Sequence, residues 1–282
     1  MEADAPFDRC LRRLRRDRAA HMRRPDYWEQ LIDEELAERL AMVSRSFRDV
    51  LVLGFSTLSD RLRGQDMAVT TADPGFLFAK RSQGVQCDED RLAFADGCFD
   101  LILAPGTLDS VNDLPGALTL IRRALRPDGL FLAAFPGAGS LPKIKQAMLA
   151  ADLEGGGAAP RIHPQIDVRA AGDLLVRAGF RLPVVDSHGV TIRFSSMQQL
   201  VADLRAAAAT NVLAVRRRPL TRAAYAHASA AFMSQADPDG KVSEKLEIIH
   251  LSAWAPSPDQ PRAAARGSGR QSLADVLKPP SR

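Results

Sequence analysis

The sequence predicts a doubly wound α/β fold built around a mostly parallel, seven-stranded sheet. Short apolar runs, typical of strands covered on both faces, alternate with segments whose apolar residues recur at helical spacing. The clearest run is Phe99–Ala104, which precedes a helix capped by Asp113 and then a turn at Pro127–Gly129. Strands that alternate with helices indicate βαβ units and hence a parallel sheet. Residues 246–254 predict a last strand, antiparallel and at the sheet edge.

The individual elements follow from the same patterns in chain order. Two helices, at 6–20 and 27–42, precede the first strand. Strands are predicted at 49–54, 66–71, 84–87, 99–104, 130–135, 183–194 and 246–254. Further helices are predicted at 59–63, 114–126, 140–152, 167–178, 195–209 and 220–235. A turn at Asp186–Gly189 could divide the strand at 183–194 into two, and the Gly-rich segment 154–160 is expected to be a mobile loop.

The chain length and composition favour one large core with additions. The 282 residues are 46% hydrophobic and 26% charged, which is ordinary for a globular protein. We expect N-terminal helices over 1–44, one α/β domain with helical insertions over 45–254, and a disordered tail over 255–282. The three cysteines show no metal-ligand spacing, so we expect no metal site, a reducing compartment and a cytoplasmic location.

The net charge of +4 is concentrated at the N-terminus. One interpretation is a solvated helix whose Phe7, Cys10, Leu11 and Leu14 face the core. A second is a basic helix that docks an acidic partner, RNA or an anionic membrane. A third is a transit peptide, against which the acidic residues of this segment argue. The arginines concerned are Arg9, Arg12, Arg13, Arg15, Arg16, Arg18, Arg23 and Arg24.

Several motifs resemble one enzyme superfamily. The pattern L-x-F-x-D-G-x-F-D-L-I-L begins at Leu92, and R-R-A-L-R-P-D-G-L-F-L begins at Arg122. Together they resemble class I S-adenosylmethionine (SAM)-dependent methyltransferases. Residues 111–118, 166–169 and 247–251 narrow the resemblance to bacterial relatives of the methyltransferase-fold assembly factor of mitochondrial complex I. The methyltransferase of biotin synthesis, which acts on a malonyl carrier-protein ester, is a cousin. The resemblance implies a Rossmann-like fold, SAM as cofactor and a protein partner modified during complex I assembly, by hydroxylation of an arginine in that family.

The resemblance also implies a cofactor site made of three parts. A Gly-rich turn after the first strand would begin at Gly54, but Ser56 and Leu58 stand where the family has glycines, and Phe55 adds bulk. Asp73 is either the carboxylate for the ribose diol or part of an Asp-Pro turn. Asp88 and Glu89 would contact the adenine, or they form a solvated turn. Ala104, at the end of the fourth strand, would face the site. The degenerate turn leaves an alternative function, a non-catalytic pseudo-methyltransferase that acts as a binding or assembly factor.

The sequence identifies no catalytic residue. His163 could act as a general base or serve the structure. Arg205 could pair with an acidic substrate group or lie on a helix surface. Asp109 departs from the family, which usually carries His or a similar residue there. His163 and Arg205 therefore remain candidates for the side of the site that faces a substrate, and Asp109 is a further departure from the family pattern.

Overall fold

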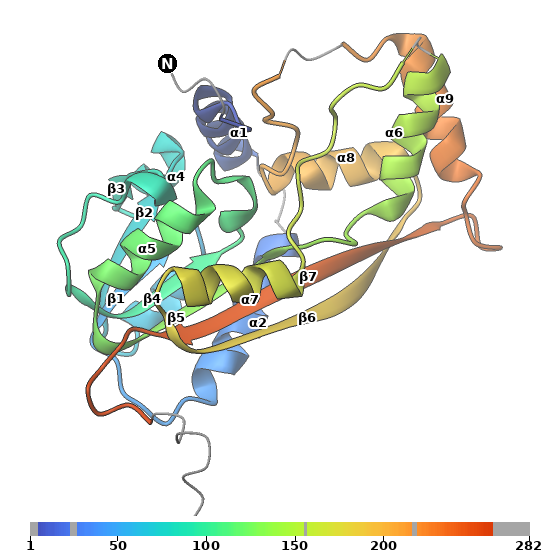
Figure 1. The fold of residues 1–282 in the computed structure, drawn as a ribbon. Coiled ribbons are helices and arrows are strands. Elements are labelled where there is room, and N and C mark those ends of the chain that lie inside the picture. The colour runs from blue at the N-terminus through green and yellow to red at the C-terminus, as the bar shows by residue number, and fades with distance from the viewer. Residues whose placement is uncertain (1–4, 23–26, 155–156, 216–218, 262–282) are drawn as a thin grey trace, which may run out of the picture.

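The protein forms a seven-stranded mixed sheet covered by helices on both faces (Figure 1). The computed structural model describes residues 5–22, 27–154, 157–215 and 219–261. The strand order is β3-β2-β1-β4-β5-β7-β6, and within this part of the chain only β7 runs against the others. The strands are β1 Asp49–Leu53, β2 Ala68–Asp73, β3 Val85–Gln86, β4 Phe99–Pro105, β5 Leu125–Pro136, β6 Arg181–Phe194 and β7 Val242–Trp254. The predicted fold class is therefore confirmed.

Eight of the nine helices in the described residues lie where the apolar spacing predicts them, with ends that differ by a few residues, and the short helix after the second strand was not predicted. The helices are α1 Arg9–His21, α2 Tyr27–Ala41, α3 Leu58–Arg63, α4 Phe76–Arg81, α5 Leu114–Ala124, α6 Pro142–Glu154, α7 Val168–Arg177, α8 Met197–Ala206 and α9 Arg222–Met233. Short 3₁₀ turns lie at Glu89–Arg91 and Leu108–Ser110. The side chain of Asp113 accepts a hydrogen bond from the backbone N–H of Gly116, and that of Asp167 from Ala170, so both predicted caps are present. None of the described helices is both long and apolar enough to cross a membrane.

The sheet separates two apolar layers because side chains alternate along each strand. On β4, Ile102 and Ala104 pack into the layer that contains α5 and α7. Leu101 and Leu103 point to the other face, where they meet α2 and α3. A third apolar cluster joins α6, α8 and α9 to the far ends of β6 and β7. All four β4 residues are fully buried, which explains why their run of sequence is apolar throughout.

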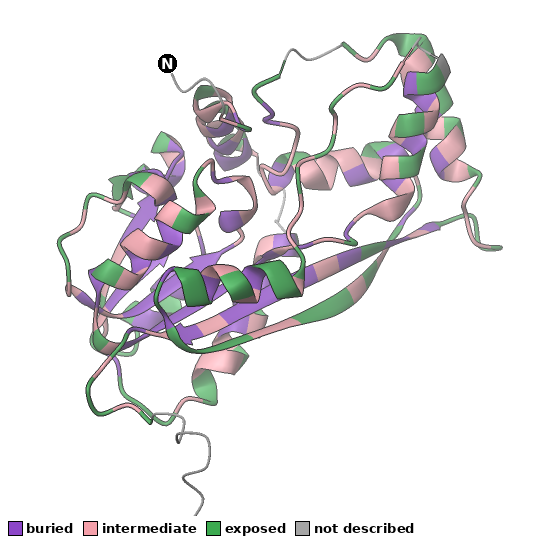
Figure 2. Cartoon of the chain, viewed as in Figure 1, coloured by how far each residue is buried: buried purple, intermediate pink, exposed green. Residues whose placement is uncertain are grey.

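The prediction that residues 246–254 form an edge strand was wrong. The strand β7 is interior, because it pairs with β5 on one side and with β6 on the other. The edge strand is β6, which is one strand and not two, because it continues without a break through Asp186–Gly189. Glu247 pairs with Gly189, so this glycine lies in the ladder. Figure 2 shows the exposure of β6 along this edge. Of the predicted tail, residues 255–261 pack beside β5, and the rest lies outside the described residues.

Candidate functional site

The candidate site lies at the edge of the sheet where the parallel strands have their carboxyl ends. In open α/β sheets this edge is where ligands bind. The loops that follow β1, β2, β3 and β4 meet here, and α1 lies across them (Figure 1). The residues predicted to bind the cofactor are Gly54, Asp73, Asp88, Glu89 and Ala104. The structure brings three of them, the acidic ones, into contact with α1.

Asp73 at the end of β2 is a fully engaged carboxylate. Its Oδ1 accepts hydrogen bonds from Arg16 Nε (2.7 Å) and the Gly75 N–H (2.7 Å). Its Oδ2 accepts from Arg16 Nη2 (2.5 Å) and the Phe55 N–H (2.9 Å). A carboxylate has about four acceptor positions, and Asp73 is 1% exposed. In this arrangement Asp73 has no acceptor position left for the hydroxyl groups of a ribose.

Glu89 forms the second buried pair with α1. Arg12 donates from Nη1 and Nη2 to the two carboxylate oxygens, at 2.7 and 3.0 Å. The same guanidinium donates to the Thr107 carbonyl (2.8 Å) and to Ser110 Oγ (3.1 Å). Burial by itself would lower the pKa of Arg12 and of Arg16, but Glu89 and Asp73 outweigh it and raise both pKa values above the ordinary value. Both arginines therefore stay charged.

Two more carboxylates extend these pairs into a row, which we call the acid row: Asp73, Asp88, Glu89 and Asp90. Arg13 Nη2 donates to Asp88 Oδ2 at 2.5 Å. Arg9 donates to both oxygens of Asp90, at 2.5 and 2.6 Å, and these hydrogen bonds lower the pKa of Asp90 although burial opposes them. Among the described residues, Asp88 Oδ1 is buried and has no hydrogen-bond donor. The acid row thus meets an arginine at every position and keeps one unsatisfied oxygen.

The orientation of α1 contradicts the first interpretation of the N-terminus. Phe7 is buried as expected, but Cys10 is exposed and Leu14 is 45% exposed. The buried side carries Arg12 and Arg16 instead, and Figure 2 shows buried and exposed positions side by side on this helix. The physical reason is the acid row, because buried carboxylates require cationic partners. The signal was present in the sequence: Arg9, Arg12, Arg13 and Arg16 follow the i, i+3, i+4, i+7 spacing of one helix face.

The loop after β1 is held by α2. Gly54 has φ +103°, and a Cβ there would lie 2.4 Å from Thr107 Cγ2, so this glycine is required for contact with the end of β4. Asp33 on α2 accepts hydrogen bonds from Ser56 Oγ (2.6 Å), Thr57 Oγ1 (2.8 Å) and the Leu58 N–H (3.2 Å). Burial raises the pKa of Asp33, although these hydrogen bonds oppose the shift. No pattern in the sequence distinguished Asp33 from the other acids of its helix.

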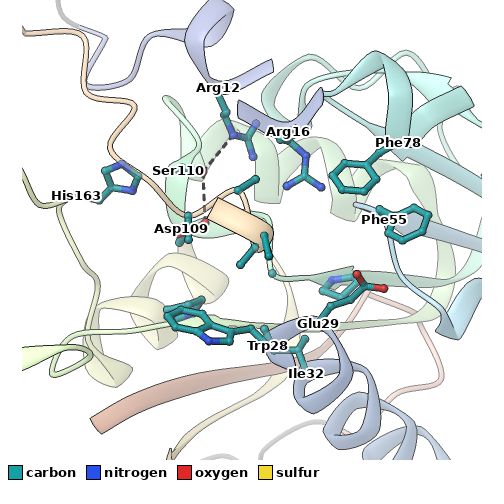
Figure 3. A pocket seen from close by; sticks show the side chains of 17 residues that line it. Arg12, Arg16, Trp28, Glu29, Ile32, Phe55, Phe78, Asp109, Ser110 and His163 are labelled. Atoms are coloured by element: carbon teal, nitrogen blue, oxygen red, sulfur yellow. Dashed lines mark hydrogen bonds between the residues drawn. The ribbon is translucent and has the colours of Figure 1, made fainter. Parts of the chain in front are cut away.

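The two bulky residues of this loop, Phe55 and Leu58, pack in different places. Phe55 stacks on Phe78, with ring centroids 4.7 Å apart, and Arg16 lies over the Phe78 ring at 5.3 Å (Figure 3). Leu58 points away into the layer formed with α2. Ala104, the fifth predicted cofactor residue, is fully buried in the apolar layer with α5 and α7 and does not line the cavity beside Phe55. Phe55 and α1 therefore fill the cleft, and Leu58 does not.

Little space remains where a nucleoside would lie. The cavity bordered by Arg16, Phe55, Phe78 and Trp28 has a volume of about 70 Å³. Small-molecule sites usually measure roughly 300–1,000 Å³. With Asp73 saturated and Asp33 bonded to the first loop, the residues as arranged do not fit SAM.

Two larger cavities adjoin the first, and all three are bordered by Asp109 and Pro136; we call the two larger ones the Asp109 cavities. One has a volume of about 180 Å³ and an apolar lining from α2, α6 and α8 that includes Met148 and Leu204. The other has about 360 Å³ and lies between Phe7 and the start of α7. Asp109 accepts a long hydrogen bond of 3.3 Å from Ser110 (Figure 3). The space around Asp109 is therefore larger than the space beside Asp73 and Phe55.

The other two candidates are His163 and Arg205. His163 Nε2 accepts a hydrogen bond from the Val212 N–H at 3.0 Å, and its ring meets the edge of Phe7 at 5.2 Å. Burial lowers the pKa of His163. Arg205 is exposed on α8. Within the described ranges no group of three or more His, Cys, Asp or Glu side chains could hold a metal ion.

Comparisons with known proteins agree with this architecture. A family model for a methyltransferase domain matches residues 54–133. The "Arginine-hydroxylase NDUFAF5, mitochondrial" of Danio rerio is 31% identical, over 96% of this chain and 89% of the relative. The malonyl-[acyl-carrier protein] O-methyltransferase of Halorhodospira halophila is 27% identical, over 96% of this chain and 95% of the relative. A crystal structure of a putative methyltransferase from Bacillus halodurans shares the fold, with a TM-score of 0.52 and 16% identity, over 79% of this chain and 99% of the other.

Proposed function

Since this chain belongs to the NDUFAF5 family of methyltransferase-fold proteins, we propose that it serves as an assembly factor that binds a protein partner and leaves SAM unused. The partner would be a subunit of respiratory complex I, as the family resemblance implies. The observation that carries the proposal is the pairing of Asp73 with Arg16. We further propose a cytoplasmic location, which the three free cysteines support, all of them in described parts of the chain.

The pairing opposes cofactor binding through its energetics. A ribose can bond to Asp73 only if Arg16 leaves, since the four acceptor positions are taken. Breaking a buried ion pair by removing one partner costs about 3–5 kcal/mol, because the other charge stays buried. A cofactor would have to supply this free energy in addition to the usual cost of binding.

The Asp109 cavities are the surface that we assign to the partner. The cavity beside α6 and α8 presents Met148, Val201 and Leu204, and a polar rim that includes Asp109 and Asn211. An apolar pocket with a few polar groups is the usual form of a site that receives an inserted side chain. The name of the mitochondrial relatives would make an arginine the residue that is modified, but this assignment belongs to them.

The first test is a titration of the full-length protein with S-adenosylhomocysteine. We expect no heat of binding and no shift of the melting temperature at millimolar ligand. Binding in the micromolar range would overturn the proposal that SAM is unused. The Asp88→Ala variant then reports whether the binding uses the predicted adenine contact, since it should abolish the heat.

The second test separates the partner surface from the fold. In a bacterial strain that lacks the gene, the wild-type chain should restore NADH-dependent complex I activity. Leu204→Asp places a charge in the apolar cavity and should fail to restore it, while the circular dichroism of the purified variant stays native. Val176→Asp is the matched control, because Val176 is 61% exposed on α7, away from the cavity. Equal activity of both variants would reject the assigned surface.

One observation favours a second candidate function, methyl transfer from SAM. Asp88 Oδ1 is buried without a donor in the described structure, and an unsatisfied buried acceptor costs about 1–3 kcal/mol. An adenine amino group is a donor that would satisfy it. When bound, SAM would supply an electrophilic methyl group. The role left to the protein is alignment in a dry pocket, and this candidate requires the titration above to give binding.

A further inference from the structure

The contact between α1 and the rest of the protein is mainly ionic. Four arginines of α1 pair with the four carboxylates of the acid row, at distances from 2.5 to 3.0 Å. Its apolar contacts come from smaller or partly buried side chains: Ala19 and Ala20 pack with Phe78, and Leu11 packs beside Phe7, which precedes the helix and contacts Val212 and Leu213. A helix held mainly by apolar area would have the opposite pattern.

Buried ion pairs contribute little net free energy to such a contact. The attraction between the charges is largely offset by the loss of their hydration. If α1 leaves as a unit, its arginines and the acid row both return to water, and no uncompensated charge stays buried. Release of the whole helix is therefore less costly than the loss of one partner in the docked state. Docking also leaves Asp88 Oδ1 without a donor in the described structure, which weakens the docked state further.

Arg16 makes the two contacts that a nucleoside would make at this place. Its guanidinium donates hydrogen bonds to both oxygens of Asp73. The same group lies over the ring of Phe78 (Figure 3). A ribose diol needs the carboxylate, and a base stacks on an aromatic face, as guanidinium groups also do. The same carboxylate and the same ring cannot serve both ligands at once.

We propose that the acid row is an arginine-binding site whose resident ligand is α1, and that α1 and an adenine nucleoside occupy it in a mutually exclusive manner. The inference rests on the proposed function in one respect, the closed cleft that leaves SAM unused in the intact chain. Release of α1 exposes Asp73, Asp88 and Glu89 together with the stacked pair Phe55 and Phe78. The N-terminal helix thereby regulates access to the site.

The test compares full-length variants by calorimetry with S-adenosylhomocysteine and by hydrogen exchange of the α1 amides. Arg16→Gln removes the charge that holds Asp73. Ala20→Trp leaves every charge in place and displaces α1 by bulk, because Ala20 is 1% exposed. Both variants should bind the ligand roughly tenfold or more tightly than wild type, a difference of about 1.4 kcal/mol. Arg18→Gln, an exposed arginine of the same helix, should behave as wild type.

The outcomes distinguish this inference from the proposed function. If both variants exchange their α1 amides freely and still give no heat, the acid row is no nucleoside site and the inference is overturned. If wild type binds the ligand while α1 stays protected, mutual exclusion is overturned as well. If wild type binds the ligand and its α1 amides become exposed, the proposal that SAM is unused fails, and the mutual exclusion is supported. Ala20→Trp keeps the test decisive even if Arg16→Gln fails to fold.

Discussion

The acid row and the Asp109 cavities lie at the same edge of the same sheet, but the first is filled by side chains of the protein and the second remain open. In the acid row each carboxylate is paired with an arginine of α1, and about 70 Å³ of space remains beside it. The Asp109 cavities have about 180 and 360 Å³. The fold therefore keeps open space at one part of its binding edge, while α1 of the same chain closes the other part.

The physical cause is the difference between charged and apolar linings. A buried carboxylate without a partner is strongly unfavourable, so each carboxylate of the acid row is paired with an arginine of the same chain. An apolar cavity loses only dispersion contacts and can remain open for a partner. The carboxylates that would make the acid row a nucleoside site are thus the same groups that bind the arginines of α1 and close it.

The largest expected effect tests whether Gly54 serves the fold. Gly54→Ala should lower the free energy of unfolding by roughly 2–5 kcal/mol, the sum of about 1–2 for positive φ and about 1–3 for overpacking against Thr107. Gly97→Ala is the control, since Gly97 also has positive φ (+66°) and no atom lies within 4 Å of its Cβ position. Urea unfolding measures both. Equal losses would mean that the contact with Thr107 is unimportant.

The second-largest loss of stability is expected for the pair Arg16–Asp73, which closes the acid row. Arg16→Ala should lower the free energy of unfolding by about 3 kcal/mol, the low end for a broken buried pair, because α1 can leave and allow Asp73 to be hydrated. Arg18→Ala, on the exposed side of α1, should change it by less than about 0.5 kcal/mol. In a double-mutant cycle with Asp73→Ala the losses should not add. Additive losses would contradict the direct pairing.

The third prediction concerns pH and the wall of the Asp109 cavities. Burial lowers the pKa of His163 below 6.5, so the unfolded state binds the proton more tightly. Stability should therefore fall as the pH drops below about 6.5, by at most about 1.4 kcal/mol per pH unit for this group. His163→Gln should reduce the acid sensitivity measured by thermal unfolding between pH 7 and 5. His250, whose pKa burial also lowers, should preserve part of it.

The smallest effect is expected for an ion pair of the same kind at the surface of the protein. Arg39 on α2 makes two hydrogen bonds to Asp186 on β6, at 2.9 and 2.6 Å, with both side chains partly exposed. Arg39→Ala should lower the free energy of unfolding by no more than about 1 kcal/mol. Chemical denaturation of this variant beside Arg16→Ala isolates the contribution of burial. A loss as large as that of Arg16→Ala would show that burial does not distinguish the two pairs.

Reasoning from the sequence alone gave the strands along the chain, the caps at Asp113 and Asp167, and the position of Asp73, Asp88 and Glu89 after their strands, but it missed the short helix α4. These features follow from local spacing and from the rule that parallel strands end at one edge. The same local reasoning placed Leu14 on the buried side of α1, which was wrong, and β7 at the edge of the sheet, which was also wrong. Both errors concern what an element packs against.

Only the tertiary structure decided which groups occupy the candidate site. Arg16 reaches Asp73 across 57 residues of sequence, and Arg12 reaches Glu89 across 77. Asp33 bonds to a loop more than 20 residues away. Spacing and propensity describe each segment separately. The pairing of buried charges depends on which surfaces the completed sheet brings together, because a carboxylate requires a partner once folding removes its water.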